Sequence, residues 1–171
     1  MVVWIIGLSG CGKTTLAKEV VRLARELSQA TVLLDGDEIR ELFEDNFDHS
    51  LEGRKANADR ICRLSRFLEQ QEVNVVCAIL SLFPESRNWC RKNLINYYEV
   101  FIDTPIHELI QRDSKGLYQQ FNEGNIRNVA GLDLEFKRPE TPDLLIKNDG
   151  TLDDFLLNAP LICQQLNGVV K

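Results

Sequence analysis

The feature that most constrains the fold of this chain is a glycine-rich loop close to its N-terminus. Residues 7–15 read Gly-Leu-Ser-Gly-Cys-Gly-Lys-Thr-Thr and match the pattern G-x-x-x-x-G-K-[ST]. An unbroken apolar run at residues 2–6 precedes the loop and is typical of a buried parallel strand. After the loop, apolar residues recur at helical spacing from Leu16 to Leu27. The sequence therefore predicts a strand, a phosphate-binding loop and a helix, in that order.

This order explains how such a loop holds phosphate. Glycines adopt dihedrals closed to other residues, so successive N–H groups can point into one concavity at the start of the helix. Lys13 adds a full positive charge for the β- and γ-phosphates, and the Thr14 hydroxyl is placed to ligate Mg²⁺. We therefore expect ATP or GTP to bind with Mg²⁺. The candidate nucleotide contacts in the loop are Gly7, Leu8, Ser9, Gly10, Cys11, Gly12, Lys13, Thr14 and Thr15.

Strand and helix patterns alternate along the rest of the chain. Strand-like apolar runs occupy residues 31–34, 73–80, 98–102 and 144–146, and helical patterns occupy residues 38–44, 54–71, 84–95, a segment from 103, and 152–166. This alternation predicts a single α/β domain over residues 1–171, with a parallel sheet of about five strands and helices on both faces, as in P-loop nucleoside triphosphate hydrolases. Residues 111–142 are polar and weakly periodic, and we expect them to form a mobile lid.

Composition argues against several classes of partner and ligand. A net charge of −6 argues against non-specific nucleic-acid binding, and no apolar run approaches the length of a membrane span. The five cysteines are odd in number and scattered, without a C-x-x-C pair, which favours reduced thiols in a cytoplasm. His49 and His107 lack the spacing of zinc ligands.

Two carboxylates follow the second predicted strand. In parallel sheets ligands gather at the carboxyl ends of the strands, so Asp35 and Asp37 should face the phosphate loop. A carboxylate there can accept a proton from a hydroxyl nucleophile or hold Mg²⁺. The alternative is an Asp-Gly turn in which Asp37 caps the next helix.

Three further groups are candidates for anion binding. Arg54, Asn57 and Arg60 share one broad helix face and could clamp an anion, or could form an ordinary solvated face. Ser81 lies just beyond the third strand and could contact substrate or simply end the strand. Basic residues in the lid, such as Lys115, could close over phosphates or belong to a surface loop.

With these pieces in order, residues 2–149 resemble the adenylylsulfate (APS) kinase family. Besides the loop, the family's Leu-Asp-Gly-Asp-x-x-Arg, Arg-x-x-Asn-x-x-Arg and Arg-Asp-x-Lys-Gly-Leu-Tyr patterns are matched at residues 34–40, 54–60 and 112–118. Gly-x-Asp and Pro-Glu-x-Pro-Asp are matched at residues 131–133 and 139–143. The resemblance implies a kinase that transfers the γ-phosphate of ATP to the ribose 3′-hydroxyl of adenylylsulfate. It also implies a homodimer.

The resemblance also implies roles for single residues. Asp35 would orient or deprotonate the hydroxyl, and Arg112 would contact ATP. Ser81 matches a serine described as a phosphoserine intermediate, but in-line transfer needs only positioning, metal and electrostatics, so we interpret it as a hydrogen-bonding contact. The candidate catalytic residues are Lys13, Asp35 and Ser81, and the candidate metal ligands are Thr14 and Asp35. The candidate acceptor contacts are Asp35, Asp37, Arg40, His49, Arg54, Asn57, Ile79, Leu80, Ser81, Lys115 and Val129.

Two departures from the family pattern leave the acceptor open. The family's Ser-Phe-Ile-Ser-Pro-Phe-Arg reads Ala-Ile-Leu-Ser-Leu-Phe-Pro at residues 78–84, so the proline and arginine are displaced. The two phenylalanines that sandwich the family's adenine are replaced by His49 and Val129, although Phe47 is close to the first position. Losing a stacking partner costs roughly 1–3 kcal/mol per base.

Three hypotheses follow. The acceptor is adenylylsulfate, or it is another nucleotide such as the cytidine diphosphoramidate used in bacterial surface-polysaccharide modification. A non-catalytic nucleotide-binding module is the third, and the retention of Lys13, Thr14, Asp35 and Asp37 argues against it.

Overall fold

The computed structural model describes residues 1–43, 48–113 and 115–166. Five parallel strands form one sheet in the order β2-β3-β1-β4-β5, which confirms the expected fold class. The strands are β1 (Val2–Ile6), β2 (Thr31–Asp35), β3 (Asn74–Ile79), β4 (Tyr97–Asp103) and β5 (Leu144–Lys147). From β1 the chain continues to β2 on one side, and from the neighbouring β3 it continues to β4 on the other side. The switch point therefore lies between β1 and β3, and loops leaving such a point border a crevice.

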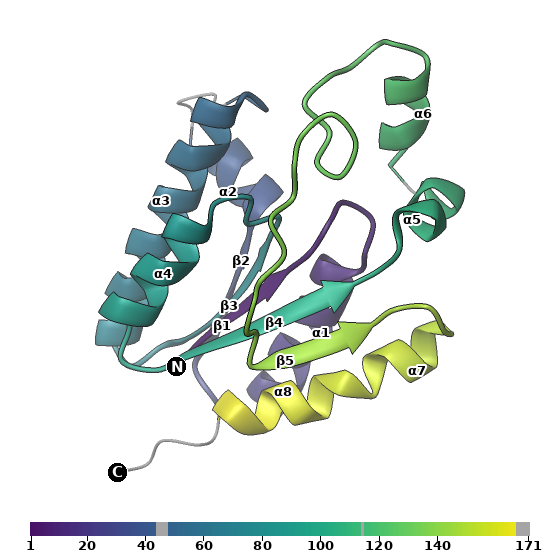
Figure 1. Ribbon diagram of the computed structural model, residues 1–171. Coiled ribbons are helices and arrows are strands. Elements are labelled where there is room, and N and C mark those ends of the chain that lie inside the picture. Colours follow the sequence, from purple (N-terminus) through teal and green to yellow (C-terminus); the bar gives the residue numbers. More distant parts are fainter. Residues whose placement is uncertain (44–47, 114, 167–171) are drawn as a thin grey trace.

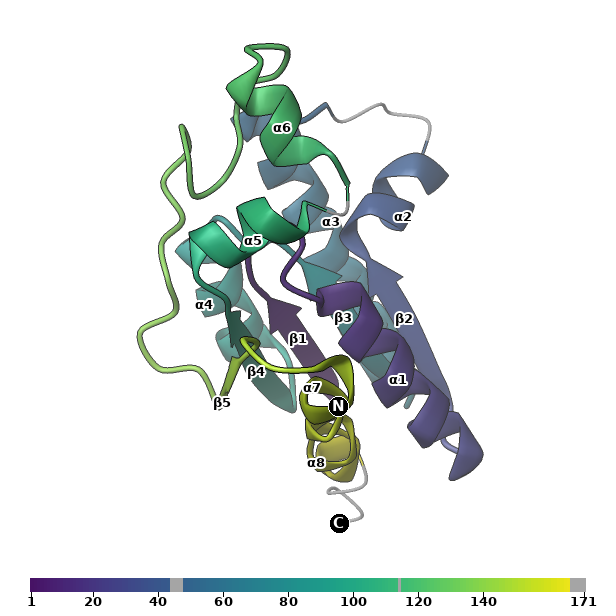
Figure 2. The ribbon, with the colours of Figure 1, turned by 90° about the vertical axis from the view of Figure 1, so that its right-hand side faces the viewer.

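Helices cover both faces of the sheet, as expected (Figures 1 and 2). The first face carries α1 (Lys13–Glu26), α7 (Leu152–Leu156) and α8 (Asn158–Leu166). The second face carries α2 (Gly36–Leu42), α3 (Leu51–Gln70) and α4 (Pro84–Asn93). Two short helices, α5 (Ile106–Arg112) and α6 (Leu117–Asn122), lie beyond the carboxyl ends of the strands. No helix within the described ranges is both long and apolar enough to cross a membrane.

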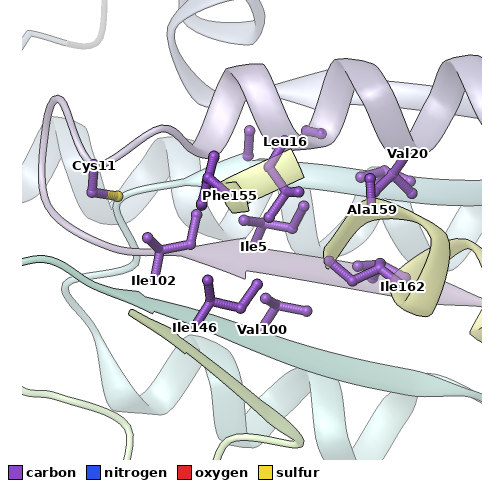
Figure 3. Packing of buried hydrophobic residues seen from close by; sticks show 14 of the residues in the cluster. Ile5, Cys11, Leu16, Val20, Val100, Ile102, Ile146, Phe155, Ala159 and Ile162 are labelled. Atoms are coloured by element: carbon purple, nitrogen blue, oxygen red, sulfur yellow. The ribbon is translucent and has the colours of Figure 1, made fainter. Parts of the chain in front are cut away.

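The apolar run at the N-terminus explains why the sheet is a middle layer between two layers of helices. Strand side chains alternate between faces, and β1 is fully buried on both sides. Val3 and Ile5 belong to the core beneath α1 and α8, whereas Trp4 and Ile6 belong to the core beneath α3 and α4. Figure 3 shows how side chains of β1, β4, α1 and α8 meet in the first core.

The observed strands and α4 lie within two residues of their predicted ends, and α2 begins two residues before its predicted start. The helices α3 and α5 each begin three residues from their predicted starts. The third helix begins at Leu51, because the Ser50 hydroxyl caps it by accepting the Gly53 N–H. The predicted closing helix is two helices, broken at Leu157. Pro160 has no N–H to donate within a continuous helix, which is consistent with a helix start there. Thr151 caps α7 as expected.

The expected lid region contains regular structure that the sequence pattern did not predict. Its helix α6 starts after Gly116 in a left-handed conformation (φ 65°), and the Asp113 carboxylate accepts the N–H groups of Tyr118 and Gln119. A helix of six residues is too short to give a clear apolar period, so its signal was missed. The predicted helix end at Glu44, together with Phe47 and Ser114, lies outside the described residues.

Candidate active site

A cavity of about 810 Å³ opens at the carboxyl edge of the sheet. It is bordered by the phosphate loop, the ends of β2 and β3, helix α3 and the lid. Every predicted acceptor contact lines it: Asp35, Asp37, Arg40, His49, Arg54, Asn57, Ile79, Leu80, Ser81, Lys115 and Val129. Of the predicted ATP contacts, Ser9, Gly10, Gly12, Lys13, Thr14 and Thr15 line it, whereas Gly7, Leu8, Cys11 and Arg112 do not.

Two glycines of the phosphate loop are required by close packing. A Cβ at Gly7 would lie 2.7 Å from the Ile102 carbonyl oxygen. A Cβ at Gly12 would lie 2.9 Å from the Phe155 ring, and Gly12 also has a φ of 99°, which side chains rarely adopt. The loop is therefore held tightly against β4 and α7, and its backbone faces the cavity from the start of α1.

Thr14 and Asp35 meet across the cavity. The Thr14 hydroxyl donates to Asp35 Oδ2 over 2.6 Å, and the Asp37 N–H donates to Asp35 Oδ1 over 2.9 Å. Asp35 is thus the N-cap of α2, and the alternative in which Asp37 caps this helix is wrong. A hydroxyl and a carboxylate that converge beside a phosphate loop are oxygen ligands of the kind that Mg²⁺ prefers, so these residues fit the metal.

The predicted anion clamp on α3 is only partly formed. Arg54 donates to the His49 carbonyl over 2.9 Å and to the Asn128 carbonyl over 3.0 Å, so it joins the start of α3 to the lid. Asn57 is buried and donates to the Gly36 carbonyl over 2.9 Å. The Arg60 guanidinium instead lies 4.2 Å from the Phe43 ring centroid and does not line the cavity. The i, i+6 spacing rotates Arg60 away from Arg54 on the helix.

Ser81 occupies a constrained position at the end of β3. It is 3% exposed and has a φ of 53°, in the left-handed region that non-glycine residues seldom enter. Its hydroxyl accepts the Trp4 indole N–H over 3.3 Å, and its carbonyl accepts Arg87 Nη1 over 2.8 Å. Sequence reasoning missed Arg87. The sequence did contain a signal for Arg87. The arginine of the family's Ser-Phe-Ile-Ser-Pro-Phe-Arg pattern is displaced in this chain, and Arg87 lies in the first turn of α4.

Charges of both signs gather around the acceptor side. Lys115 Nζ lies 2.9 Å from Asp37 Oδ2, which connects the lid to α2. Burial alone would raise the pKa of Asp37, but the hydrogen bond from Lys115 and the charges of Lys115, Lys13 and Arg40 lower it overall. The same hydrogen bond raises the pKa of Lys115. The pair is therefore ionised at neutral pH.

Among the described residues, His49 and Val129 occupy the two positions at which the family has phenylalanines that sandwich the base. Val129 is 3% exposed and supplies a small apolar surface. His49 supplies an imidazole whose pKa is lowered by partial burial and by the positive charges of Arg40 and Arg54. The imidazole is accordingly neutral at pH 7 and can stack on a base or form hydrogen bonds with it.

Comparison with known proteins identifies the family. The family model for adenylylsulphate kinase matches residues 1–147. The chain belongs to the adenylylsulphate kinase family. As a member, it is a phosphotransferase whose acceptor group is a hydroxyl.

Several known proteins resemble the chain over most of its length. The cytidine diphosphoramidate kinase of Campylobacter jejuni is 39% identical over 147 residues, covering 86% of this chain and 85% of that protein. The adenylyl-sulfate kinase of Pseudomonas aeruginosa is 36% identical over 147 residues, covering 85% and 75%. The structure of the Mycobacterium tuberculosis APS kinase in complex with AMPPNP and APS superposes with a TM-score of 0.89 at 31% identity, covering 98% and 97%.

Proposed function

We propose that this chain transfers the γ-phosphate of ATP to the ribose 3′-hydroxyl of a nucleotide. The observation that carries the proposal is the convergence, in one cavity, of the phosphate loop, Asp35 and the acceptor residues on α2, α3 and the lid. The Asp35 carboxylate is buried and close to the loop, where it would orient the attacking hydroxyl or accept its proton. Lys13 and the loop N–H groups would stabilise the charge on the transferred phosphoryl group.

The metal and the remaining residues complete the proposal. Thr14 and Asp35 would hold Mg²⁺, which neutralises charge on the β- and γ-phosphates when it is bound. Arg112 would contact ATP, while Arg40, Arg54 and Lys115 would bind anionic groups of the acceptor. Ser81 would contact the acceptor rather than carry phosphate, because its hydroxyl is buried against Trp4. Residues 111–142 would act as a lid over both nucleotides.

Two acceptors are compatible with this cavity. Adenylylsulfate, in sulfate assimilation, is the substrate from which the family takes its name. The replacements His49 and Val129 favour a cytidine diphosphoramidate, in capsular or other surface-polysaccharide modification, because an adenine sandwich is missing from the described residues. The relative at 39% identity supports the same choice. We therefore place the cytidine compound first.

An ADP-release assay with MgATP decides between the acceptors. The panel contains adenylylsulfate, cytidine 5′-diphosphoramidate and cytidine 5′-diphosphate. We expect turnover with the diphosphoramidate and at least about tenfold lower kcat/KM with adenylylsulfate, the size of one lost stacking contact. The reverse ranking would assign the chain to sulfate activation, and no turnover with any member would refute the proposed activity.

We also propose a homodimer in a reducing cytoplasm. Support comes from the family resemblance and from the five cysteines, which are all buried and free. Sedimentation equilibrium tests the dimer, and a monomer at micromolar concentration would contradict it.

A further inference from the structure

Arg87, in the first turns of α4, is a buried arginine that joins two segments distant in the chain. The residue is 6% exposed. Its Nη1 donates to the Ser81 carbonyl over 2.8 Å, and its Nη2 donates to the Lys137 carbonyl over 3.2 Å. Within the described part of the chain, no carboxylate forms an ion pair with it. Buried charges are normally paired or fully hydrogen-bonded, so these two carbonyls are what holds the guanidinium.

The first carbonyl belongs to the acceptor loop, residues 80–83, which connects β3 to α4 and lines the cavity. Ser81 has the left-handed backbone conformation described above. Such a conformation persists only when the surroundings determine it. Trp4 holds the side chain of Ser81 and Arg87 holds its carbonyl, so these two contacts determine how the loop faces the cavity.

The second carbonyl belongs to the return segment, residues 135–143, which contains the last part of the expected lid and leads to β5 without helix or strand (Figure 1). Side chains of α4 hold this segment by hydrogen bonds to its carbonyls, whereas a strand would be held by backbone hydrogen bonds to its neighbours. Arg91, one turn after Arg87, donates to the Thr141 carbonyl over 3.1 Å and lies 3.3 Å from Asp143. Among the described residues, Arg91 donates to Thr141 and Asp143 and forms no hydrogen bond with the acceptor loop. Arg87 alone of this pair therefore contacts both segments.

We propose that Arg87 is a positioning residue that couples the acceptor loop to the base of the lid. The inference rests on the proposed nucleotide kinase activity. One planar guanidinium binds both carbonyls. A change in the return segment therefore alters the support of Ser81, and a change at Ser81 alters the support of the return segment. Under the proposed function, the ATP phosphates would be bound elsewhere, by residues 7–15. Loss of Arg87 therefore weakens acceptor binding selectively.

The kinetic test compares Arg87→Gln with Arg91→Gln in the full chain. Gln at position 87 cannot span both carbonyls. Gln at position 91 removes contacts with the return segment and with Glu99 and Tyr97 of β4, and it leaves the hydrogen bonds of Ser81 in place. With MgATP and the acceptor that the wild type uses, we expect Arg87→Gln to raise the acceptor KM roughly tenfold, the size of a lost charge-assisted hydrogen bond. The ATP KM should change by less than about twofold, and Arg91→Gln should leave both constants within about threefold. Equal effects on both KM values, or an identical effect of Arg91→Gln, would overturn the proposal.

A second measurement does not need turnover. Hydrogen exchange in the Arg87→Gln protein should accelerate in peptides covering residues 80–83 and 135–143, while α8 keeps its wild-type rate. Acceleration confined to one segment, or spread over the whole chain, would refute the coupling. If the wild type phosphorylates no nucleotide, the proposed function fails, and the exchange result still decides whether Arg87 couples the two segments.

Discussion

At the scale of single residues, Asp35 combines two tasks that a substitution can separate. Its Oδ1 caps α2 and its Oδ2 faces Thr14. Asp35→Asn keeps an oxygen for the cap but removes the negative charge. We expect kcat to fall by about 100-fold or more with little change in melting temperature. ADP release and thermal unfolding measure the two quantities.

Asp35→Ala is the matched control for the cap. It should lose the same activity and, in addition, about 1 kcal/mol of stability. If Asp35→Asn retained wild-type kcat, the proposed role as proton acceptor would be wrong.

His49 provides a prediction for pH. Because its pKa in the folded protein is lowered from 6.5, protonation is harder in the folded than in the unfolded chain. The contribution of His49 to stability is therefore constant above pH 6.5 and declines as pH falls from 6.5 through the folded pKa. Titration of the imidazole by NMR should give a midpoint below 6.5, and denaturant unfolding should show the decline.

His49→Phe is the control for this pH effect. This substitution should remove the His49 contribution to the loss of stability below pH 6.5, while an aromatic ring remains at the position. An NMR midpoint at or above 6.5 would contradict the assignment of a neutral imidazole.

At the scale of elements, the lid is joined to the phosphate loop by a buried hydroxyl. Tyr118 in α6 is 2% exposed and donates to the Ser9 carbonyl over 2.9 Å. Burial raises the pKa of Tyr118 to about 12, so the donor keeps its proton in any ordinary assay. Tyr118→Phe should cost about 1 kcal/mol and raise the ATP KM roughly threefold to tenfold, independently of pH between 6 and 9.

Tyr97→Phe is the matched control for Tyr118→Phe. Tyr97 donates to Glu99 over 2.8 Å on β4 and does not line the cavity. Its loss should lower stability and leave the ATP KM unchanged. An unaltered ATP KM in Tyr118→Phe would show that the lid contact does not serve nucleotide binding.

At the scale of the whole molecule, β1 connects the two cores. Ile5 is fully buried in the first core, and its neighbours Trp4 and Ile6 are buried in the second. If the chain is one cooperative domain, Ile5→Ala should lower the free energy of unfolding by about 2–5 kcal/mol in a single transition. Urea unfolding followed by tryptophan fluorescence and by circular dichroism gives the measurement, and non-coincident transitions would contradict a single domain.

The sequence by itself determined the order of strands and helices, the phosphate loop and its family, because these depend on local periodicity and contiguous motifs. It also predicted a set of acceptor residues, and all of them line one cavity. It did not determine that Asp35 caps α2, that Arg60 turns toward Phe43, or that α6 forms within the lid.

Those outcomes depend on side-chain directions and on short elements, which carry little periodic signal. Only the tertiary structure brought Arg87 to Lys137, because a bond between segments 50 residues apart leaves no local pattern in the sequence.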